Sequence, residues 1–251
     1  VTYQSSDVIS ACIKSLLASK NVKLDIVVCD NASNDTTIPQ VERLADEHDV
    51  HIRELGPYET APHIPQAEKS ITLIRSKVNL GYAAAANLGI KTLFQNPSID
   101  LFWLLNPDCT VTPSTAEAYA NKAQATQQFS LMGGRTIYAE PPNLIQSDGG
   151  LINKWTGVCR TFNRGADPTS APPPPESDID FIAGANFVAS RPFIETAGLM
   201  NEHYFLYYEE VDWALRRGSL PFLLCVDAIA YHEGGTSIGT GSLTRRSSAF
   251  A

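Results

Sequence analysis

Residues 101–110, LFWLLNPDCT, decide the fold expected for this chain. Five apolar residues in a row, 101–105, predict a strand that is buried on both faces, as in a parallel sheet. Pro107 ends the strand, because proline has no backbone N–H to donate. Asp108 therefore follows the carboxyl end of a strand, where open α/β sheets place their ligand crevice. This position suits a metal ligand, although Asn-Pro-Asp taken alone favours an ordinary turn.

Strands and helices alternate along the first half of the chain. Strands are predicted at residues 24–29, 71–74 and 101–105, and helices at 8–17, 37–47 and from residue 82 onward. This alternation predicts an α/β fold with a doubly wound, mainly parallel sheet flanked by helices. The stretch 51–69 contains Pro57, Pro62 and Pro65, and it is predicted as a long surface loop.

The second half of the chain has a different pattern. Helices are predicted at 113–128 and 192–198, strands at 129–138 and 222–231, and short antiparallel strands within 151–163. Four consecutive prolines at 172–175 predict an extended, poorly packed loop over 167–178, near the site or its rim. The pattern adds a small antiparallel portion to the parallel sheet, within one domain that covers residues 1–251.

Composition limits the possible partners and the cellular setting. The chain has 251 residues, a net charge of −8 and no basic stripe, which argues against a nucleic-acid partner. Its five cysteines are widely spaced, which favours reduced, mostly buried thiols in a cytosolic protein. No apolar run reaches the length of a membrane span. Residues 1–3, Val-Thr-Tyr, look like the end of a strand whose beginning is missing.

An acidic segment is the strongest candidate for acid–base chemistry. Glu209, Glu210 and Asp212 follow an aromatic run, and Arg216 is spaced to pair with Asp212 on a helix. A carboxylate left free beside an apolar wall is what a general base requires. A solvated acidic helix face with i,i+4 ion pairs is the alternative, and the adjacent aromatic residues make it less favourable.

Two further positions carry weaker patterns. Gly81 interrupts a strand just before an alanine-rich helix, whose N-terminus would favour an anion; tight packing against the sheet would also require alanines. His232 follows a strand, as Asp108 does. A lone histidine is more often structural, but one imidazole, one carboxylate and two phosphate oxygens would form a workable divalent-metal site.

The ordered set of motifs resembles family 2 glycosyltransferases of the GT-A fold, and looks closest to their rhamnosyltransferase-like bacterial branch. The resemblance covers nearly the whole chain. It is carried by Val1-Thr2-Tyr3, the Asp30–Asp35 cluster, Asn79-x-Gly81-x5-Asn87-x-Gly89, Asn106-Pro107-Asp108, Gly184-Ala185, Glu209-Glu210-Val211-Asp212 with Arg216, and His232.

The resemblance implies a role for each matched position in donor binding. It implies that Thr2 and Tyr3 line the nucleotide pocket, that Asp30 hydrogen-bonds the pyrimidine, and that Asn79 and Gly81 lie against the nucleotide and diphosphate. Asn106-Pro107-Asp108 stands where the family has its DxD motif. The resemblance therefore implies that Asp108 is the metal ligand, with Asn106 as a hydrogen-bonding partner, and that His232 helps to hold the metal or the diphosphate.

Glu209-Glu210 stands where the family commonly has Glu-Asp. The second acid of that pair is the usual base, which implies Glu210, but the longer side chain leaves Glu209 open as well. The resemblance divides the domain into a nucleotide-binding half at about residues 1–110 and an acceptor-binding half at about 111–251.

The implied function is an inverting, metal-dependent sugar transfer. The expected cofactor is Mg²⁺ or Mn²⁺, the expected donor a dTDP- or UDP-sugar, and the expected acceptor a glycan or lipid-linked glycan of polysaccharide or cell-wall biosynthesis. A cytoplasmic location is expected, with peripheral association at the inner face of the membrane. Two alternatives stay open: an inactive module that binds a nucleotide sugar or glycan, and a nucleotidyltransferase, although the basic, Gly-rich phosphate loop of the latter is not visible.

Overall fold

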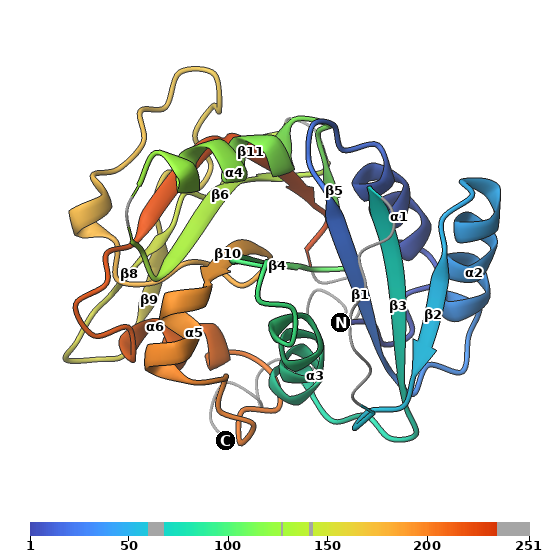
Figure 1. Cartoon of the computed structure of the whole chain (residues 1–251). Coiled ribbons are helices and arrows are strands. Elements are labelled where there is room, and N and C mark those ends of the chain that lie inside the picture. The colour runs from blue at the N-terminus through green and yellow to red at the C-terminus, as the bar shows by residue number, and fades with distance from the viewer. Residues whose placement is uncertain (60–67, 127, 141–142, 235–251) are drawn as a thin grey trace.

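A three-stranded parallel sheet forms the first half of the chain (Figure 1). The computed structural model describes residues 1–59, 68–126, 128–140 and 143–234; Pro62 and Pro65 of the predicted loop lie outside them. The strand order is β1–β3–β2, with β1 at Leu24–Asn31, β3 at Lys69–Ser76 and β2 at Ile52–Leu55. Helices α1 (Ile9–Leu17) and α2 (Thr37–Glu47) bury apolar side chains against this sheet, and α3 (Tyr82–Phe94) also packs on β1.

Strand β2 corrects the prediction of a loop over residues 51–69. Its sequence, Ile-Arg-Glu-Leu, has no period-two alternation and is short, so no local pattern indicates a strand. It forms because it pairs in parallel with β3, where Ile52 lies opposite Ile71 and Leu55 opposite Ile74. The tertiary pairing therefore decides the structure of this segment.

A six-stranded mixed sheet forms the second half. Its order is β4–β10–β6–β11–β5, with β7 paired to β6. Strands β6 and β11 are parallel, and the other pairs are antiparallel. The strands are β4 (Leu101–Leu105), β5 (Cys109–Val111), β6 (Leu131–Tyr138), β7 (Ile145–Ser147), β10 (Asn186–Ser190) and β11 (Leu223–His232). The predicted α/β class is confirmed, and the antiparallel portion extends further than predicted because β4 pairs with β10.

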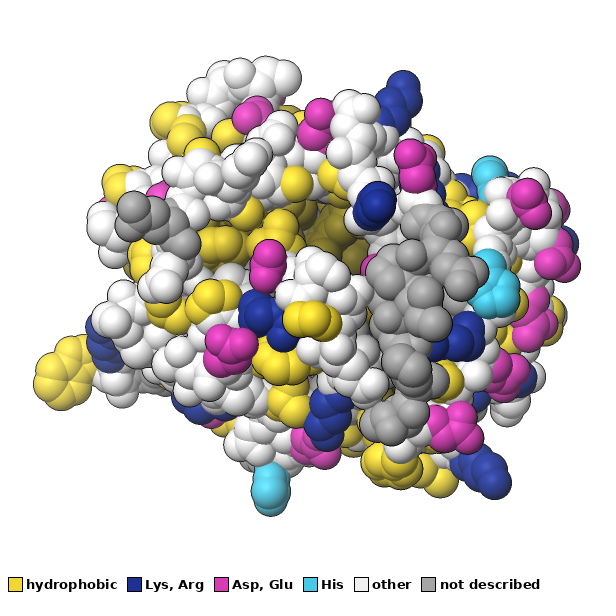
Figure 2. Space-filling view, in the orientation of Figure 1, with side chains coloured by type: hydrophobic (Ala, Val, Ile, Leu, Met, Phe, Trp, Pro, Cys, Tyr) yellow, Lys and Arg dark blue, Asp and Glu magenta, His cyan; other side chains and the backbone are white. Residues whose placement is uncertain are grey.

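Strand β4 is buried less completely than predicted. Phe102 and Leu104 are buried, whereas residues 101, 103 and 105 keep part of their surface. The reason is that β4 lies at the edge of the mixed sheet and is not hydrogen-bonded to β1. A cavity of about 140 Å³ lies between these two strands and α3. In Figure 2, the face of the molecule toward the viewer is hollowed near its centre, and hydrophobic side chains line the hollow.

The remaining helices cover the mixed sheet. Helix α4 (Thr115–Gln124) packs Tyr119 against it, and Trp213 of α6 (Glu209–Leu215) contacts Phe193 of α5 (Arg191–Ala197) in the main core. Strands β8 (Gly150–Ile152) and β9 (Cys159–Thr161) form a separate hairpin at the left of Figure 1. The described part of the chain contains no helix of the length and hydropathy needed to cross a bilayer.

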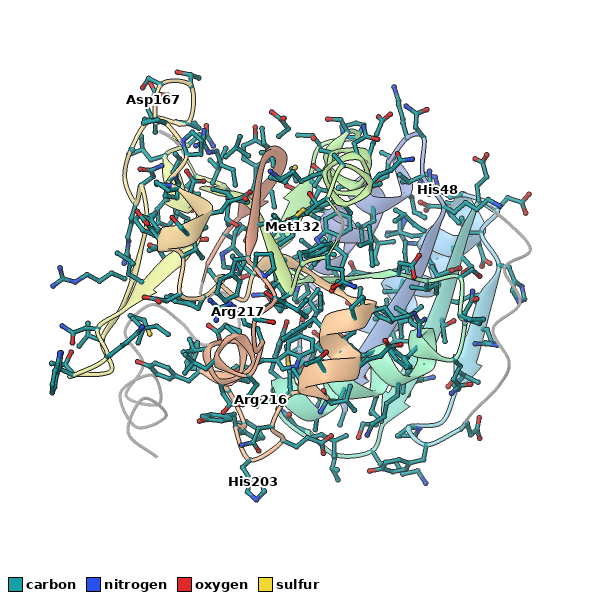
Figure 3. All side chains as sticks on the ribbon, turned by 60° about the vertical axis from the view of Figure 1, so that its left-hand side comes forward. His48, Met132, Asp167, His203, Arg216 and Arg217 are labelled. Carbon is teal, nitrogen blue, oxygen red and sulfur yellow. The ribbon has the colours of Figure 1, made fainter. Side chains whose placement is uncertain are left out.

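The proline-rich segment is packed more firmly than the predicted loop. The guanidinium of Arg135 pairs with buried Asp148 and donates to the carbonyls of Pro168 and Ala171. The segment ends in a 3-10 helix at Glu176–Asp178, and Glu176 accepts a hydrogen bond from the N–H of Leu224. In Figure 3, Asp167 lies at the upper left edge of the molecule, whereas Arg216 and Arg217 of the α6 region lie lower and nearer its centre. The segment is therefore pinned to the mixed sheet, away from the acidic helix.

Candidate functional site

Thr2 and Asp30 meet at the carboxyl end of β1. The two residues form a parallel β-bridge, and the Thr2 hydroxyl donates to Asp30 Oδ1 at 3.1 Å. The other carboxylate oxygen accepts from the N–H of Ser33 at 3.1 Å. Asp30 is 4% exposed, whereas the adjacent Tyr3 is 43% exposed. The structure thus brings together the predicted residues at this strand end and holds the Asp30 carboxylate in one orientation.

Asn31, the last residue of β1, joins this strand end to the loop after β3. Its side-chain amide donates to the carbonyl of Gly81 at 3.0 Å and accepts from the N–H of Leu80 at 3.3 Å. The exposed Asn79 accepts from the N–H of Gly81 at 2.9 Å. Asn31 belongs to the predicted polar cluster, but only its hydrogen bonds in the structure show that it shapes the Asn79–Gly81 turn.

Gly81 is in contact with the segment that precedes the acidic helix. Its φ is +82°, and a Cβ at this position would lie 2.6 Å from the carbonyl oxygen of Phe205. The same carbonyl accepts a hydrogen bond from the N–H of Tyr82 at 2.8 Å. Glycine is required here both by the backbone conformation and by the close approach of Phe205.

Asn87 makes a second connection between α3 and the same segment. Its side chain donates to the carbonyl of Met200 at 2.9 Å and accepts from the N–H of Met200 at 3.0 Å. It also donates to Glu202 at 2.9 Å, and it is 1% exposed. This explains why an asparagine occurs on the buried face of α3.

Helix α6 places two glutamates in a water-poor environment. Glu209 is 5% exposed. The Oε2 atoms of Glu209 and Glu210 are both buried and have no hydrogen-bond partner among the described residues. Burial raises the pKa of Glu209 to about 8, with a further contribution from the charge of Glu210. Burial also raises the pKa of Glu210 above its ordinary range. Both carboxyl groups therefore titrate closer to neutral pH than a solvated glutamate.

The remaining charges of this helix are structural. Asp212 pairs with Arg216 at 3.0 Å, as the spacing predicted, and Arg216 also donates to the carbonyls of Ala197 and Leu199. Arg217 lies on another side of the helix end (Figure 3), with its guanidinium 4.3 Å from the ring centre of Phe222. The ion pair accounts for Asp212, which leaves Glu209 and Glu210 as the candidates for chemistry.

The segment before the glutamates has an unusual backbone. Tyr207 and Tyr208 have φ values of +69° and +67°. Bulky residues seldom adopt this left-handed conformation, which costs on the order of 1–3 kcal/mol per residue. The contacts of Asn87, Gly81 and Arg216 hold the residues that precede these tyrosines, at Met200, Phe205 and Leu199.

Asp108 and His232 form a carboxylate–imidazole pair on neighbouring strand ends. Asp108 Oδ1 lies 3.1 Å from His232 Nε2, and both side chains are largely buried. The pair is brought together because β5 and β11 are antiparallel, with Cys109 opposite His232. The N–H of Glu233 donates to the carbonyl of Asp108 at 3.1 Å. The predicted pairing of these two residues is therefore present in the structure.

Gln146 orients the imidazole, and sequence reasoning missed it. Its Oε1 lies 2.7 Å from His232 Nδ1. A carbonyl oxygen is an acceptor, so this contact is made by an Nδ1–H group and leaves Nε2 facing the Asp108 oxygen at 3.1 Å. A proton or a metal cation can lie between these two atoms. The donor set thus fits a cation, and the N,O combination suits Mn²⁺ better than Mg²⁺, which prefers oxygen ligands.

Cys109 completes the group of potential ligands, since its sulfur lies within 4.8 Å of the ligand atoms of Asp108 and His232. Its thiol is buried and lies 3.5 Å from the carbonyl of Ala185. Burial and the charge of Asp108 raise its pKa well above the ordinary thiol value. A neutral thiol is a poor ligand, so we assign Cys109 to packing.

Gly184 and Ala185 connect the glutamates with the Asn106–Asp108 turn. A Cβ on Gly184 would lie 3.6 Å from the Glu210 carboxyl carbon. The carbonyl of Ala185 accepts from the N–H of Asn106 at 3.0 Å. Burial and then the negative charges of Glu209 and Glu210 raise the pKa of Tyr82 above its ordinary value. The predicted donor, metal and acid–base residues therefore occupy one continuous region.

A wider groove of about 700 Å³ lies elsewhere, between α4, Pro173-Pro174 and residues 224–227 of β11. None of the predicted site residues lines it. The convergence of polar side chains, rather than the size of the cavity, therefore locates the candidate site.

The fold and the site define an α/β domain of the glycosyltransferase class. The family model described as "Glycosyl transferase family 2" matches residues 1–169 of this chain. Because this match covers more than half of the chain, the chain belongs to glycosyl transferase family 2.

A curated relative and solved structures agree with this class. The low-salt glycan biosynthesis hexosyltransferase Agl10 of Haloferax volcanii is 24% identical over 149 residues, which are 58% of this chain and 46% of that protein. The mannosyltransferase PcManGT from Pyrobaculum calidifontis, in complex with GDP-Man and Mn²⁺, has a TM-score of 0.62 at 15% identity and covers 92% of this chain and 55% of its own. GalNAc-T7 with UDP, GalNAc and Mn²⁺ has a TM-score of 0.60 at 12% identity, and the match covers 90% of this chain and 41% of that protein. The chain thus spans about half the length of the proteins that it matches.

Proposed function

We propose that this chain transfers a sugar, with inversion, from a nucleoside-diphosphate sugar to a glycan or lipid-linked acceptor. The observation that supports this proposal most is the pair of buried glutamates, Glu209 and Glu210, beside the Asp108–His232 pair. A base and a cation site next to each other are what displacement of a diphosphate by a hydroxyl requires.

Residues 1 to about 110 hold the donor in this proposal. Thr2, Tyr3 and Asp30 line the nucleotide pocket, and the Asn79–Gly81 turn lies against the diphosphate. Asn106 is a hydrogen-bonding partner, and Asp108 with His232 would hold a divalent cation. When bound, that cation would neutralise negative charge on the departing diphosphate. The donor is proposed to be a dTDP- or UDP-sugar, and rhamnose is one candidate sugar.

Glu210 is the proposed general base. Glu209, with a pKa of about 8, keeps its proton near neutral pH, so no negative charge on Glu209 opposes the ionisation of Glu210. The Glu210 carboxylate takes the proton of an acceptor hydroxyl while the acceptor oxygen attacks the anomeric carbon. The bond from that carbon to the diphosphate breaks, and the diphosphate departs with the bonding electrons. Attack from the face opposite the leaving group inverts the anomeric centre.

The acceptor is proposed to belong to surface-polysaccharide or cell-wall biosynthesis, which residues from about 111 onward would bind. The proposed location is the cytoplasm, at the inner face of the membrane. The mannosyltransferase complex holds GDP-Man and Mn²⁺, and the Agl10 relative is a hexosyltransferase of glycan biosynthesis. These relatives support a nucleotide-sugar donor and a glycan product for this chain.

The test is turnover of nucleotide sugars with Mn²⁺ or Mg²⁺, for the wild type and Glu210→Gln. GDP-mannose is included beside dTDP- and UDP-sugars. The variant should lose about 10²–10⁴-fold in rate, the usual contribution of a general base, while donor affinity stays within a factor of a few. Wild-type turnover in the variant would remove Glu210 from the mechanism. A wild type that binds nucleotide sugar without turning it over in the presence of acceptors would indicate the inactive binding module instead.

A further inference from the structure

The β8–β9 hairpin displays apolar side chains to solvent. Trp155 at its tip is 97% exposed, and Val158 and Leu151 are 49% and 41% exposed. In Figure 2, hydrophobic side chains project from the left edge of the molecule, where Figure 1 shows the hairpin. Exposure of a whole indole to water is unfavourable, and large exposed aromatic groups commonly mark a surface that binds a partner.

The turn that carries Trp155 is well defined. The side chain of Asn153 accepts hydrogen bonds from the N–H groups of Trp155 and Thr156 at 3.0 and 3.1 Å. Gly157 has a φ of +72° and donates to the Asn153 carbonyl at 2.7 Å. The sequence therefore builds a tight turn that holds the indole away from the domain.

The sequence of the hairpin itself is basic, and the nearby carboxylate of Asp180 accepts a hydrogen bond from the N–H of Ile152 at the base of the hairpin. Residues 149–165 contain Lys154, Arg160 and Arg164 and no acidic residue, in a chain whose net charge is −8. All three basic side chains are exposed, and Arg160 lies opposite Leu151 in the hairpin. Lys154 adjoins Trp155 and Arg160 follows on β9, whereas Arg164 donates to the hydroxyl of Tyr138 at the end of β6. An aromatic tip with basic residues beside it is complementary to the interface of a bilayer with anionic headgroups.

The base of the hairpin packs near the candidate site. Ile152, Cys159 and Phe162 pack against the core cluster that also contains Val211 and Trp213 of α6. The hairpin is thus attached to the same core as the helix that carries the buried glutamates. A bilayer in contact with the tip would be held beside the acceptor half of the domain.

We propose that the β8–β9 hairpin is a membrane-contact device, which inserts Trp155 into the interface of an anionic bilayer while Lys154 and Arg160 contact its headgroups. This inference rests on the membrane association proposed above and gives it a specific surface. Lipid binding can be measured without sugar transfer, so failure of this inference would leave the proposed transferase untouched.

The experiment is sedimentation of the full chain with vesicles of phosphatidylcholine alone or mixed with phosphatidylglycerol. Anionic vesicles should bind the wild type, and Trp155→Ala should weaken the partition by about tenfold. Replacing Lys154 and Arg160 by Gln should weaken it by about fivefold for each charge. Tyr58→Ala is the matched control, since Tyr58 is an 83% exposed aromatic residue on another part of the surface, and it should bind as the wild type does.

Tryptophan fluorescence gives a second readout at the tip itself. The chain has three tryptophans; Trp213 is fully buried, and Trp103 is half-buried with its indole N–H bonded to Asn186. Lipids brominated in their acyl chains should therefore quench mainly Trp155, and Trp155→Ala should abolish the quenching. Absence of quenching in the wild type, or equal partition of Trp155→Ala, overturns the proposal. Quenching of Trp155 by a soluble oligosaccharide, with none by brominated lipid, would overturn it in favour of a glycan contact.

Discussion

Gly81 and Phe205 approach so closely that no side chain fits between them: a Cβ on Gly81 would lie 2.6 Å from the Phe205 carbonyl oxygen and 2.8 Å from its ring. Gly81 belongs to the proposed donor loop, and Phe205 precedes the proposed base by a few residues. The contact therefore sets the distance between the Asn79–Gly81 turn, which is proposed to hold the donor, and Glu210, which is proposed to activate the acceptor.

Gly81→Ala should separate these two segments. The added methyl group meets backbone as well as side chain, and alanine at positive φ is strained, so a loss of about 1–3 kcal/mol in the free energy of unfolding is expected. Turnover should fall by more than the loss of folded protein explains. Gly218→Ala is the control, because Gly218 has a φ of +63° and no atom within 4 Å of the added Cβ. Chemical denaturation and turnover of both variants check this, and equal effects on both would show that the Phe205 contact is unimportant.

Asn87→Asp should disturb the segment that leads to Glu209 and Glu210 while keeping the side-chain size. The carboxylate cannot donate to the Met200 carbonyl, and it would face Glu202, which now accepts a hydrogen bond from Asn87. We expect kcat to fall with little change in donor KM, because Asn87 acts through the position of the glutamates. Adding Glu202→Gln should recover part of the loss by removing the repulsion. Steady-state kinetics test this, and a change confined to KM would contradict a positioning role.

Gln146→Leu should weaken metal binding without removing a proposed ligand. The substitution removes the acceptor that fixes the His232 ring, and loss of such a supporting contact typically costs about 10–100-fold in metal affinity. Asp108→Asn, which alters a proposed ligand directly, should have a larger effect. Calorimetric titration of Mn²⁺ in the presence of UDP measures both, with Asp227→Asn on the exposed part of β11 as the control. Unchanged Mn²⁺ affinity in Asp108→Asn would contradict the proposed cation site.

The stability of the protein should depend on pH through Glu209. Its pKa is raised from 4.5 to about 8 in the folded state, so the unfolded chain releases this proton at lower pH than the folded protein does. The stabilisation that this proton gives the folded state is complete below about pH 4.5 and is lost as pH rises toward 8. The free energy of unfolding should fall by up to about 1.4 kcal/mol per pH unit for one such group. Glu209→Gln should flatten this decline. Urea denaturation at pH 5, 7 and 9 measures it, and parallel curves for variant and wild type would exclude Glu209 as the cause.

The sequence by itself determined the α/β class and the identity of most candidate site residues. Apolar runs such as 101–105, each ending at a polar cluster, locate strand ends, because local hydrophobicity and proline chemistry act within a few residues. The helical period likewise located α1 and α2 and predicted the pair of Asp212 with Arg216.

Only the tertiary structure decided which partners these residues have. Strand β2 forms because β3 offers an edge, and β4 pairs with β10 across more than 80 residues of sequence. Gln146 reaches His232, and Asn87 reaches Met200, through contacts that no local pattern encodes. The raised pKa values of Glu209 and Glu210 come from desolvation, which depends on everything packed around α6. Short-range periodicity specifies which segments become strands or helices, whereas burial and long-range contact specify which of their side chains can do chemistry.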